Sequence, residues 1–157
     1  MDPYNVADAV SAGIRHIGIA VYSSGKVYEF LVRKGFDPDT ARTAVAQLVE
    51  REYIDDVRAG RKVLASRTGK KQESRALLAQ RLKASGISRD SIQEVLSECE
   101  DDRITCELLI KSCYPDISRT LCSESELNDI ITYASRRGYK PELVTSVIRK
   151  LINEQST

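Results

Sequence analysis

Apolar residues recur along most of the chain at intervals of three and four, which is the period of one face of an α-helix. The pattern is clearest in three stretches, each of which follows a glycine by six to thirteen positions. The apolar residues of these stretches are Ala41, Ala44, Val45 and Leu48, then Ile92, Val95, Leu96 and Cys99, then Val144, Val147, Ile148 and Leu151. Nowhere is there a convincing alternation with a period of two, so the pattern predicts an all-α protein.

The three glycines that precede these stretches are Gly35, Gly86 and Gly138, and they lie 51 and 52 residues apart. Each one follows a helical run, and glycine readily adopts the left-handed conformation that ends a helix. An apolar residue comes next each time and can pack back against the helix that has just ended. These residues are Phe36, Ile87 and Tyr139.

A start signal for the next helix follows each glycine. Asp37 can act as a cap with Pro38 at the first helical position, Ser88 can cap the second copy, and Pro141 opens the third. The helices that end at the glycines should begin near Gly25, Gln72 and Ser123, the last with a capping box to Glu126. One more helix precedes each pair. The expected spans are Val6 to about Val21, Asp55-Asp56 to about Arg67, and Asp101-Asp102 to about Ser112.

The sequence therefore predicts nine helices in three tandem three-helix repeats, at residues 1–54, 55–100 and 101–157. One such unit is too small to bury its own apolar face, and stacking the units solves this problem. We expect an elongated, curved right-handed-type helical array. A compact bundle with coincidental turns is the alternative, and the threefold recurrence of the glycine pattern argues against it.

Charge is segregated along the 157 residues, although the formal net charge is only +1. Residues 55–86 hold nine basic and three acidic side chains, whereas residues 87–131 hold four basic and eleven acidic ones. Arg58, Arg61 and Lys62 have the i, i+3, i+4 spacing that places them on one helical face, and Lys70-Lys71 should lie in the following turn. This basic stripe predicts binding to phosphates or to an acidic protein surface. A solvated helix face is an equally plausible interpretation of charge alone.

Signatures of catalysis, metal binding and membrane insertion are missing from the sequence. There is no phosphate-binding loop, GxSxG, HExxH or CxxC motif, and His16 stands alone, so we expect neither an enzyme nor a cofactor or metal. Cys99, Cys106 and Cys113 are spaced by seven and should lie on one helical face; with Cys122, we expect them to be structural thiols. No apolar run could span a bilayer and no signal peptide is visible, which predicts a cytoplasmic protein.

Several motifs in order resemble the RecX family, the bacterial regulators of the RecA recombinase. The central motif is Tyr53-Ile54-Asp55-Asp56-Val57-Arg58, followed by Arg67 and a helix ending in Arg81-Leu82-Lys83-Ala84-Ser85-Gly86-Ile87. Upstream stand Tyr22-Ser23-Ser24 and Leu31-Val32-Arg33-Lys34-Gly35-Phe36, and downstream Arg136-Arg137-Gly138-Tyr139. The resemblance covers about Ile14 to Leu151. The chain departs from the family at Ala59 and Gly60, where an aromatic residue and an alanine are usual, and at Lys26, where a glutamate is common.

The resemblance implies a non-enzymatic protein that binds the RecA–DNA filament and mainly inhibits its strand exchange, ATP hydrolysis and co-protease activity in DNA repair and the SOS response. It also implies direct contact with single- or double-stranded DNA. The sequence shows no long apolar seam for dimerisation, so we expect a monomer. We expect the working basic surface to consist of Arg58, Arg61, Lys62, Arg67, Lys70, Lys71 and Arg75, with Arg33, Lys34, Arg136 and Arg137 as second-rank candidates. The alternatives are a general helical nucleic-acid-binding protein and a scaffold that recognises proteins through its acidic third segment.

Overall fold

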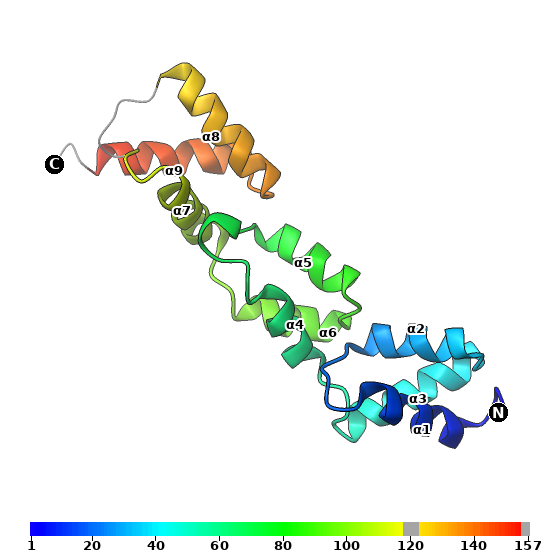
Figure 1. The fold of residues 1–157 in the computed structure, drawn as a ribbon. Helices are drawn as coiled ribbons and strands as arrows, with labels where there is room; N and C mark the ends of the chain where they lie inside the picture. Colours follow the sequence, from blue (N-terminus) through cyan, green and yellow to red (C-terminus); the bar gives the residue numbers. More distant parts are fainter. Residues whose placement is uncertain (118–122, 155–157) are drawn as a thin grey trace. The chain divides into compact units, whose positions relative to one another are not determined.

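The computed structural model describes residues 1–117 and 123–154, and in them it contains helices and no strand (Figure 1). The all-α prediction is therefore confirmed for this part of the chain. The helices are α1 (Val6–Ile17), α2 (Ser24–Lys34), α3 (Pro38–Glu50), α4 (Asp56–Leu64), the short 3₁₀ helix η1 (Gly69–Lys71), α5 (Arg75–Ala84), α6 (Arg89–Ser97), α7 (Asp102–Cys113), α8 (Glu124–Arg136) and α9 (Pro141–Asn153). None of them is long and apolar enough to cross a membrane.

The α-helices follow one another in three triplets, α1–α3, α4–α6 and α7–α9, as the tandem-repeat prediction requires. The chain forms two compact units that divide the middle triplet between them. Unit 1 contains Met1–Val63 and Arg81–Val95, and unit 2 contains Leu64–Gln80 and Leu96–Thr157. The proposed boundaries between repeats, at residues 54 and 100, stay a prediction.

The core of unit 1 lies among α1, α2 and α3, which contact one another. Val27, Leu31, Ala44 and Leu48 are fully buried there. Gly13 allows α1 to approach α3 closely, because a Cβ at this position would stand 2.7 Å from the Leu48 Cδ1 atom. The apolar positions predicted after Gly35 thus form the buried face of α3.

The core of unit 2 lies among α7, α8 and α9. Leu109, Val144 and Val147 are fully buried in it. Tyr139 is also buried, and its hydroxyl donates a 2.7 Å hydrogen bond to the Thr105 Oγ1 atom on α7. Removal from water raises the pKa of this phenol, so the group stays a neutral hydrogen-bond donor.

The three repeat glycines end α2, α5 and α8 as predicted. Gly35, Gly86 and Gly138 have φ angles of +112°, +80° and +90°, in the left-handed region. The N–H of the following apolar residue donates back to the carbonyl five positions earlier in each case. These bonds join Phe36 to Leu31, Ile87 to Leu82 and Tyr139 to Ala134, at 3.1 to 3.2 Å. This is the Schellman arrangement, and it buries the apolar residue against its own helix.

The predicted capping residues are confirmed at most helix starts. The Asp37 carboxylate accepts from the Asp39 and Thr40 N–H groups with Pro38 at the first helical position, and the Ser123 hydroxyl accepts from the Glu126 N–H. Ser88 differs: its hydroxyl lies 2.9 Å from that of Ser91, and its N–H donates to a distant carboxylate, described below.

Three helix boundaries differ from the expected ones. α1 stops at Ile17 and not near Val21, because Gly18 at φ +53° turns the chain and donates its N–H to the Ile14 carbonyl. α4 stops at Leu64, and the N–H of Arg67 closes a tight turn onto the Leu64 carbonyl. The segment that follows is η1, which delays the start of α5 from Gln72 to Arg75.

The cysteines do not share one helical face as the spacing predicted. Cys99 lies between α6 and α7, whereas Cys106 and Cys113 both lie on α7. The seven-residue spacing is therefore interrupted by a helix boundary. Cys106 is fully buried, and burial raises the pKa of its thiol to about 11, which suits an inert core residue. Cys122 lies outside the described residues.

A buried carboxylate, Asp56, joins the first and second triplets inside unit 1. Its Oδ1 atom accepts from the Ser24 N–H at 2.7 Å, and its Oδ2 atom accepts from the Ser24 hydroxyl at 2.5 Å and from the Ser88 N–H at 2.7 Å. Ser24 begins α2 and Ser88 directly precedes α6. The second aspartate of the pair expected to open α4 thus binds the starts of two other helices.

A close backbone approach adds to the hydrogen bonds of Asp56, and together these contacts form what we call the joint of unit 1. The Ser23 hydroxyl donates to the Ser85 carbonyl at 2.7 Å, and the Gly25 N–H donates to the Gly86 carbonyl at 2.9 Å. A Cβ on Gly86 would stand 2.7 Å from the Ser23 Oγ atom and 3.1 Å from the Gly25 Cα atom. Only glycine fits here, for steric reasons as well as for its backbone conformation.

Unit 2 contains an equivalent joint between the second and third triplets. The Asp102 carboxylate accepts from the Arg75 N–H at 2.8 Å at the start of α5, and the Ser74 N–H donates to the Arg137 carbonyl at 2.9 Å. The Ser74 hydroxyl caps α5 by accepting from the Leu77 N–H. It also lies where a Cβ on Gly138 would be.

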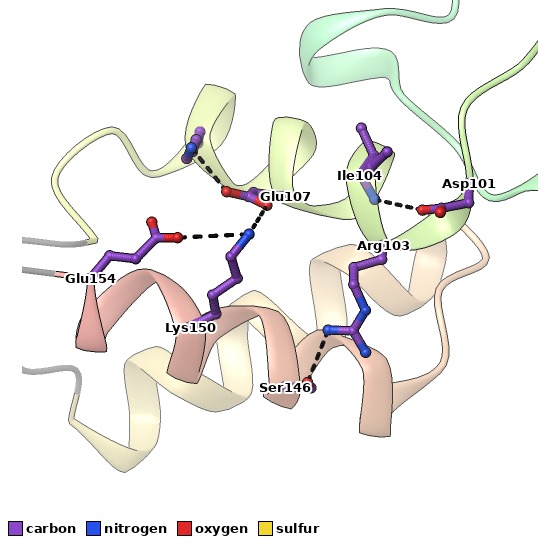
Figure 2. Close-up of polar contacts among 8 residues, drawn as sticks. Asp101, Arg103, Ile104, Glu107, Ser146, Lys150 and Glu154 are labelled. Atoms are coloured by element: carbon purple, nitrogen blue, oxygen red, sulfur yellow. Dashed lines mark hydrogen bonds and ion pairs between the residues drawn. The ribbon is translucent and has the colours of Figure 1, made fainter.

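Ionic contacts link α7 to α9 across the surface of unit 2 (Figure 2). The Glu107 carboxylate lies 3.0 Å from the Lys111 Nζ atom and 3.1 Å from the Lys150 Nζ atom, and only 17% of its side chain is exposed. Lys150 also approaches Glu154 at 3.7 Å. Hydrogen bonds from the two lysines hold the pKa of Glu107 below its ordinary value.

We predict that Gly86→Ala destabilises the protein more than Gly35→Ala. Both glycines end a helix with positive φ, which costs an alanine about 1–2 kcal/mol. A Cβ on Gly35 would meet only the flexible end of the Met1 side chain, whereas one on Gly86 would strike the Ser23 hydroxyl and the Gly25 backbone. The expected loss in the free energy of unfolding, measured in urea, is about 1–2 kcal/mol for Gly35→Ala and at least about 1 kcal/mol more for Gly86→Ala. Equal losses would show that the joint tolerates a side chain.

We predict that Asp56→Asn lowers the free energy of unfolding by about 2–3 kcal/mol, because an amide group replaces one of the acceptor oxygens that the Ser24 and Ser88 N–H groups use. Asp55→Asn is the matched control. Asp55 caps α4 by accepting from the Arg58 N–H, and asparagine caps about as well as aspartate. Urea unfolding of the two variants should therefore differ clearly, and similar losses would contradict the role of Asp56.

We predict that Glu107→Gln lowers the free energy of unfolding by about 0.5–1 kcal/mol at neutral pH and low salt. The lowered pKa means that Glu107 stabilises the folded state above its ordinary value of 4.5, and that this contribution disappears as the pH falls through the lower folded value. Thermal unfolding from pH 7 to pH 3 should show the two proteins converging. Glu154→Gln, at a half-exposed site, should change little, and a difference that persists at pH 3 would exclude the ionic origin.

Candidate interaction surfaces

Helix α4 in unit 1 carries the first part of the predicted basic stripe. Asp55 caps the helix, while Asp56, Ala59 and Gly60 form its buried side. Arg58, Arg61 and Lys62 are exposed. The i, i+3, i+4 spacing therefore places three cationic side chains at the solvent, as the sequence predicted.

Gly60 allows α4 to approach its neighbours closely. A Cβ there would stand 3.0 Å from the Val95 Cγ2 atom on α6 and 3.3 Å from the Leu82 Cδ2 atom on α5. Gly60, which stands where the family usually has alanine, therefore allows α4 to pack closely against two helices. The basic residues of α4 consequently project from a helix that is packed closely on its other side.

The turn around η1 in unit 2 carries Lys70 and Lys71, both exposed. The Tyr133 hydroxyl on α8 donates a 3.0 Å hydrogen bond to the Lys70 carbonyl. This contact anchors the backbone of the turn while leaving its side chains at the surface. The prediction that these two lysines lie in a turn is confirmed.

Arg67 and Arg75 have structural contacts within unit 2. The Arg67 Nε atom lies 3.7 Å from the Oε1 atom of Glu73, whose side chain is only 2% exposed. An Arg75 guanidinium nitrogen donates to the Leu96 carbonyl in the last turn of α6 and to the Cys99 carbonyl just after it, at 2.7 and 2.9 Å. Both side chains are only partly exposed, so less of their charge faces solvent than that of the lysines of η1.

The second-rank residues lie at the ends of α2 and α8. Arg33 and Lys34 are exposed in the last turn of α2, and the Lys34 Nζ atom lies 5.5 Å from the Phe30 ring centre. Phe30 stacks on His16 with ring centres 3.7 Å apart, so this histidine is part of an aromatic cluster. In unit 2, Arg136 is exposed.

Arg137 lies partly buried over the Tyr133 ring at 5.5 Å. The eleven predicted residues thus fall into two sets. Unit 1 holds Arg33, Lys34, Arg58, Arg61 and Lys62, and unit 2 holds Arg67, Lys70, Lys71, Arg75, Arg136 and Arg137. Each set lies in a unit of its own, and each includes exposed cationic side chains.

A groove in unit 1 adds residues that the sequence interpretation did not include. It has a volume of about 240 Å³ and is lined by Val21, Tyr22, Ser23, Lys26, Ala59, Lys62, Val63, Ser85 and Ile87. These residues come from three separate segments of the chain. No linear pattern connects Lys26 with Lys62, so the sequence carries no signal for the groove.

These surfaces are suited to binding anions. Exposed lysine and arginine side chains attract phosphates and carboxylates. In the described part of the chain, no group of three or more histidine, cysteine or acidic side chains could hold a metal ion.

Comparisons with known proteins give the family. No family model matches the chain. A protein named Regulatory protein RecX from Chlorobaculum tepidum is 25% identical over 158 residues, covering 99% of this chain and 96% of the relative. A second, from Trichlorobacter lovleyi, is 24% identical over 92% of this chain and 96% of its own length. A third, from Clostridium tetani, is 31% identical over 81% of this chain and 59% of its own length.

The fold agrees with these sequence matches. The crystal structure of RecX from Lactobacillus salivarius superimposes with a TM-score of 0.71, covering 93% of this chain and 96% of the other at 13% identity. Six curated relatives carry the same name. By its near full-length similarity to these regulatory proteins, the chain belongs to the RecX family.

Proposed function

We propose that this protein binds the RecA–DNA filament and mainly inhibits its recombinase, ATPase and co-protease activities, as a cytoplasmic regulator of DNA repair and the SOS response. The near full-length similarity to proteins named Regulatory protein RecX carries this proposal. In this proposal the protein acts by binding and catalyses no reaction. We further propose that the protein acts as a monomer that can also contact single- or double-stranded DNA directly.

We propose that the exposed cations of the predicted stripe form the main contact surfaces, one in each unit. Arg58, Arg61 and Lys62 project from α4, and Lys70 and Lys71 from η1. Side chains exposed to solvent can reach a phosphate or a carboxylate of a partner. Arg67 and Arg75 then support the surface of unit 2 by fixing the backbone around it, in view of their contacts with Glu73 and with the end of α6.

We predict that the wild-type protein reduces the DNA-dependent ATPase of RecA at substoichiometric dose and moderate salt. Inhibition at low dose is expected of a protein that acts on a filament, because one bound molecule affects many subunits. The double variant Arg61→Glu/Lys62→Glu should abolish this inhibition, since it reverses two charges of the α4 face. Circular dichroism should show unchanged helical content.

The matched control is Lys83→Glu/Arg89→Glu, which makes the same change in net charge at exposed positions of unit 1 outside the stripe. This control should inhibit nearly as well as the wild type. Normal inhibition by the Arg61→Glu/Lys62→Glu variant would overturn the surface assignment. No effect of saturating wild-type protein on RecA would overturn the function, and DNA binding that falls steeply with salt would then favour a general nucleic-acid-binding protein.

A further inference from the structure

The groove in unit 1 combines an aliphatic floor with a cationic rim. Ala59 and Ile87 are 6% exposed, and Val21 and Val63 are half-buried at its sides. Its volume of about 240 Å³ is below the roughly 300–1,000 Å³ of pockets that bind drug-sized ligands. A space of this size and lining suits one large apolar side chain.

Among the described residues that line the groove, the charged ones are Lys26 and Lys62. Lys26 approaches Glu29 at 3.7 Å, but both side chains are at least half exposed, so this pair is weak. Lys62 is exposed on α4. An apolar group that enters the groove would therefore be held best if negative charges flank it.

The walls of the groove belong to the joint of unit 1, which fixes them before any ligand arrives. Ser23 and Ser85 both line the groove, and the Ser23 hydroxyl donates a 2.7 Å hydrogen bond to the Ser85 carbonyl. The adjacent Gly25–Gly86 backbone bond of 2.9 Å holds the same two segments. A preformed site binds without the entropic cost of ordering its walls.

The lining favours a peptide over a nucleic-acid base as the occupant. Bases bind to proteins by stacking on flat aromatic faces, whereas this floor is aliphatic. The one aromatic ring, Tyr22, packs against His16 with ring centres 4.8 Å apart. Nucleic acid would use the lysines of the rim and leave the floor empty.

We propose that this groove binds an acidic peptide segment of the protein partner, inserting one large apolar side chain between Lys26 and Lys62 while flanking carboxylates pair with the two lysines. The inference rests on the proposed function for the source of the segment, a subunit of the filament. It adds a specific docking contact to a surface otherwise defined by charge alone.

The test uses two variants with matched controls. Val63→Phe fills the groove, and Val57→Phe makes the same change on α4 at a half-buried position outside it. Lys26→Glu reverses one rim charge, and Lys83→Glu makes the same change at an exposed position that does not line it. Glutamate at position 26 can form a capping box with Ser23, so the substitution does not weaken the start of α2.

Val63→Phe and Lys26→Glu should each raise the concentration for half-inhibition of the RecA ATPase about tenfold, as expected for loss of one buried anchor. Affinity for single-stranded DNA, measured by fluorescence anisotropy, should not change with Val63→Phe. Both control variants should inhibit like the wild type. Normal inhibition by Val63→Phe, or an equal loss of its DNA affinity, would overturn the peptide assignment.

A second arm separates this inference from the proposed function because it needs no RecA. A short peptide with a central leucine flanked by glutamates is titrated into the full chain and followed by NMR. Shifts at Val63 and Ile87 that disappear when alanine replaces the leucine would support the groove. Absence of these shifts would overturn it, whether or not the protein inhibits RecA.

Discussion

The N-terminal N–H groups of an α-helix have no acceptor within the helix. In unit 1 a single carboxylate accepts hydrogen bonds from such groups at the starts of two helices. Asp56 accepts from the Ser24 N–H at the start of α2 and from the Ser88 N–H beside the start of α6. Because a buried aspartate must be hydrogen-bonded, the side chain and the two helix starts depend on one another. The position of α4 relative to α2 and α6 follows from this mutual dependence.

The same solution recurs in unit 2 with different residues. Asp102 accepts at the start of α5, Ser74 caps that helix, and Gly138 provides the close approach that Gly86 provides in unit 1. In both Asp-Asp pairs the first aspartate caps its own helix and the second binds a helix of the preceding triplet. A repeat protein needs such nearest-neighbour contacts, because one triplet buries too little surface to be stable by itself.

Local signals in the sequence were sufficient for the helices, the repeat glycines and most caps. The residues responsible, such as Asp37 with Pro38, act within a few positions of one another, and a linear pattern records this distance. The roles of Asp56 and Asp102 could not be predicted in this way, because their partners lie 32 and 27 residues away in the sequence. An Asp-Asp pair at a helix start also already has a local explanation, which is helix capping. Arg67 and Arg75 were predicted from charge alone, and charge does not show that Glu73 or the end of α6 would bind them.

The joints also change the charge that a partner meets. Residues 55–86 contain three acids, and all three have structural contacts: Asp55 caps α4, Asp56 is buried in the joint of unit 1, and Glu73 is buried near Arg67 in unit 2. Arg58, Lys62, Lys70 and Lys71 are exposed to solvent. A carboxylate that accepts hydrogen bonds from helix N–H groups has part of its charge compensated by them. Six cations but only one acid, Asp55, are exposed in this segment, against nine basic and three acidic residues in its composition. The exposed charge of the segment is therefore almost entirely positive, and the contacts that hold the triplets together help to make it so.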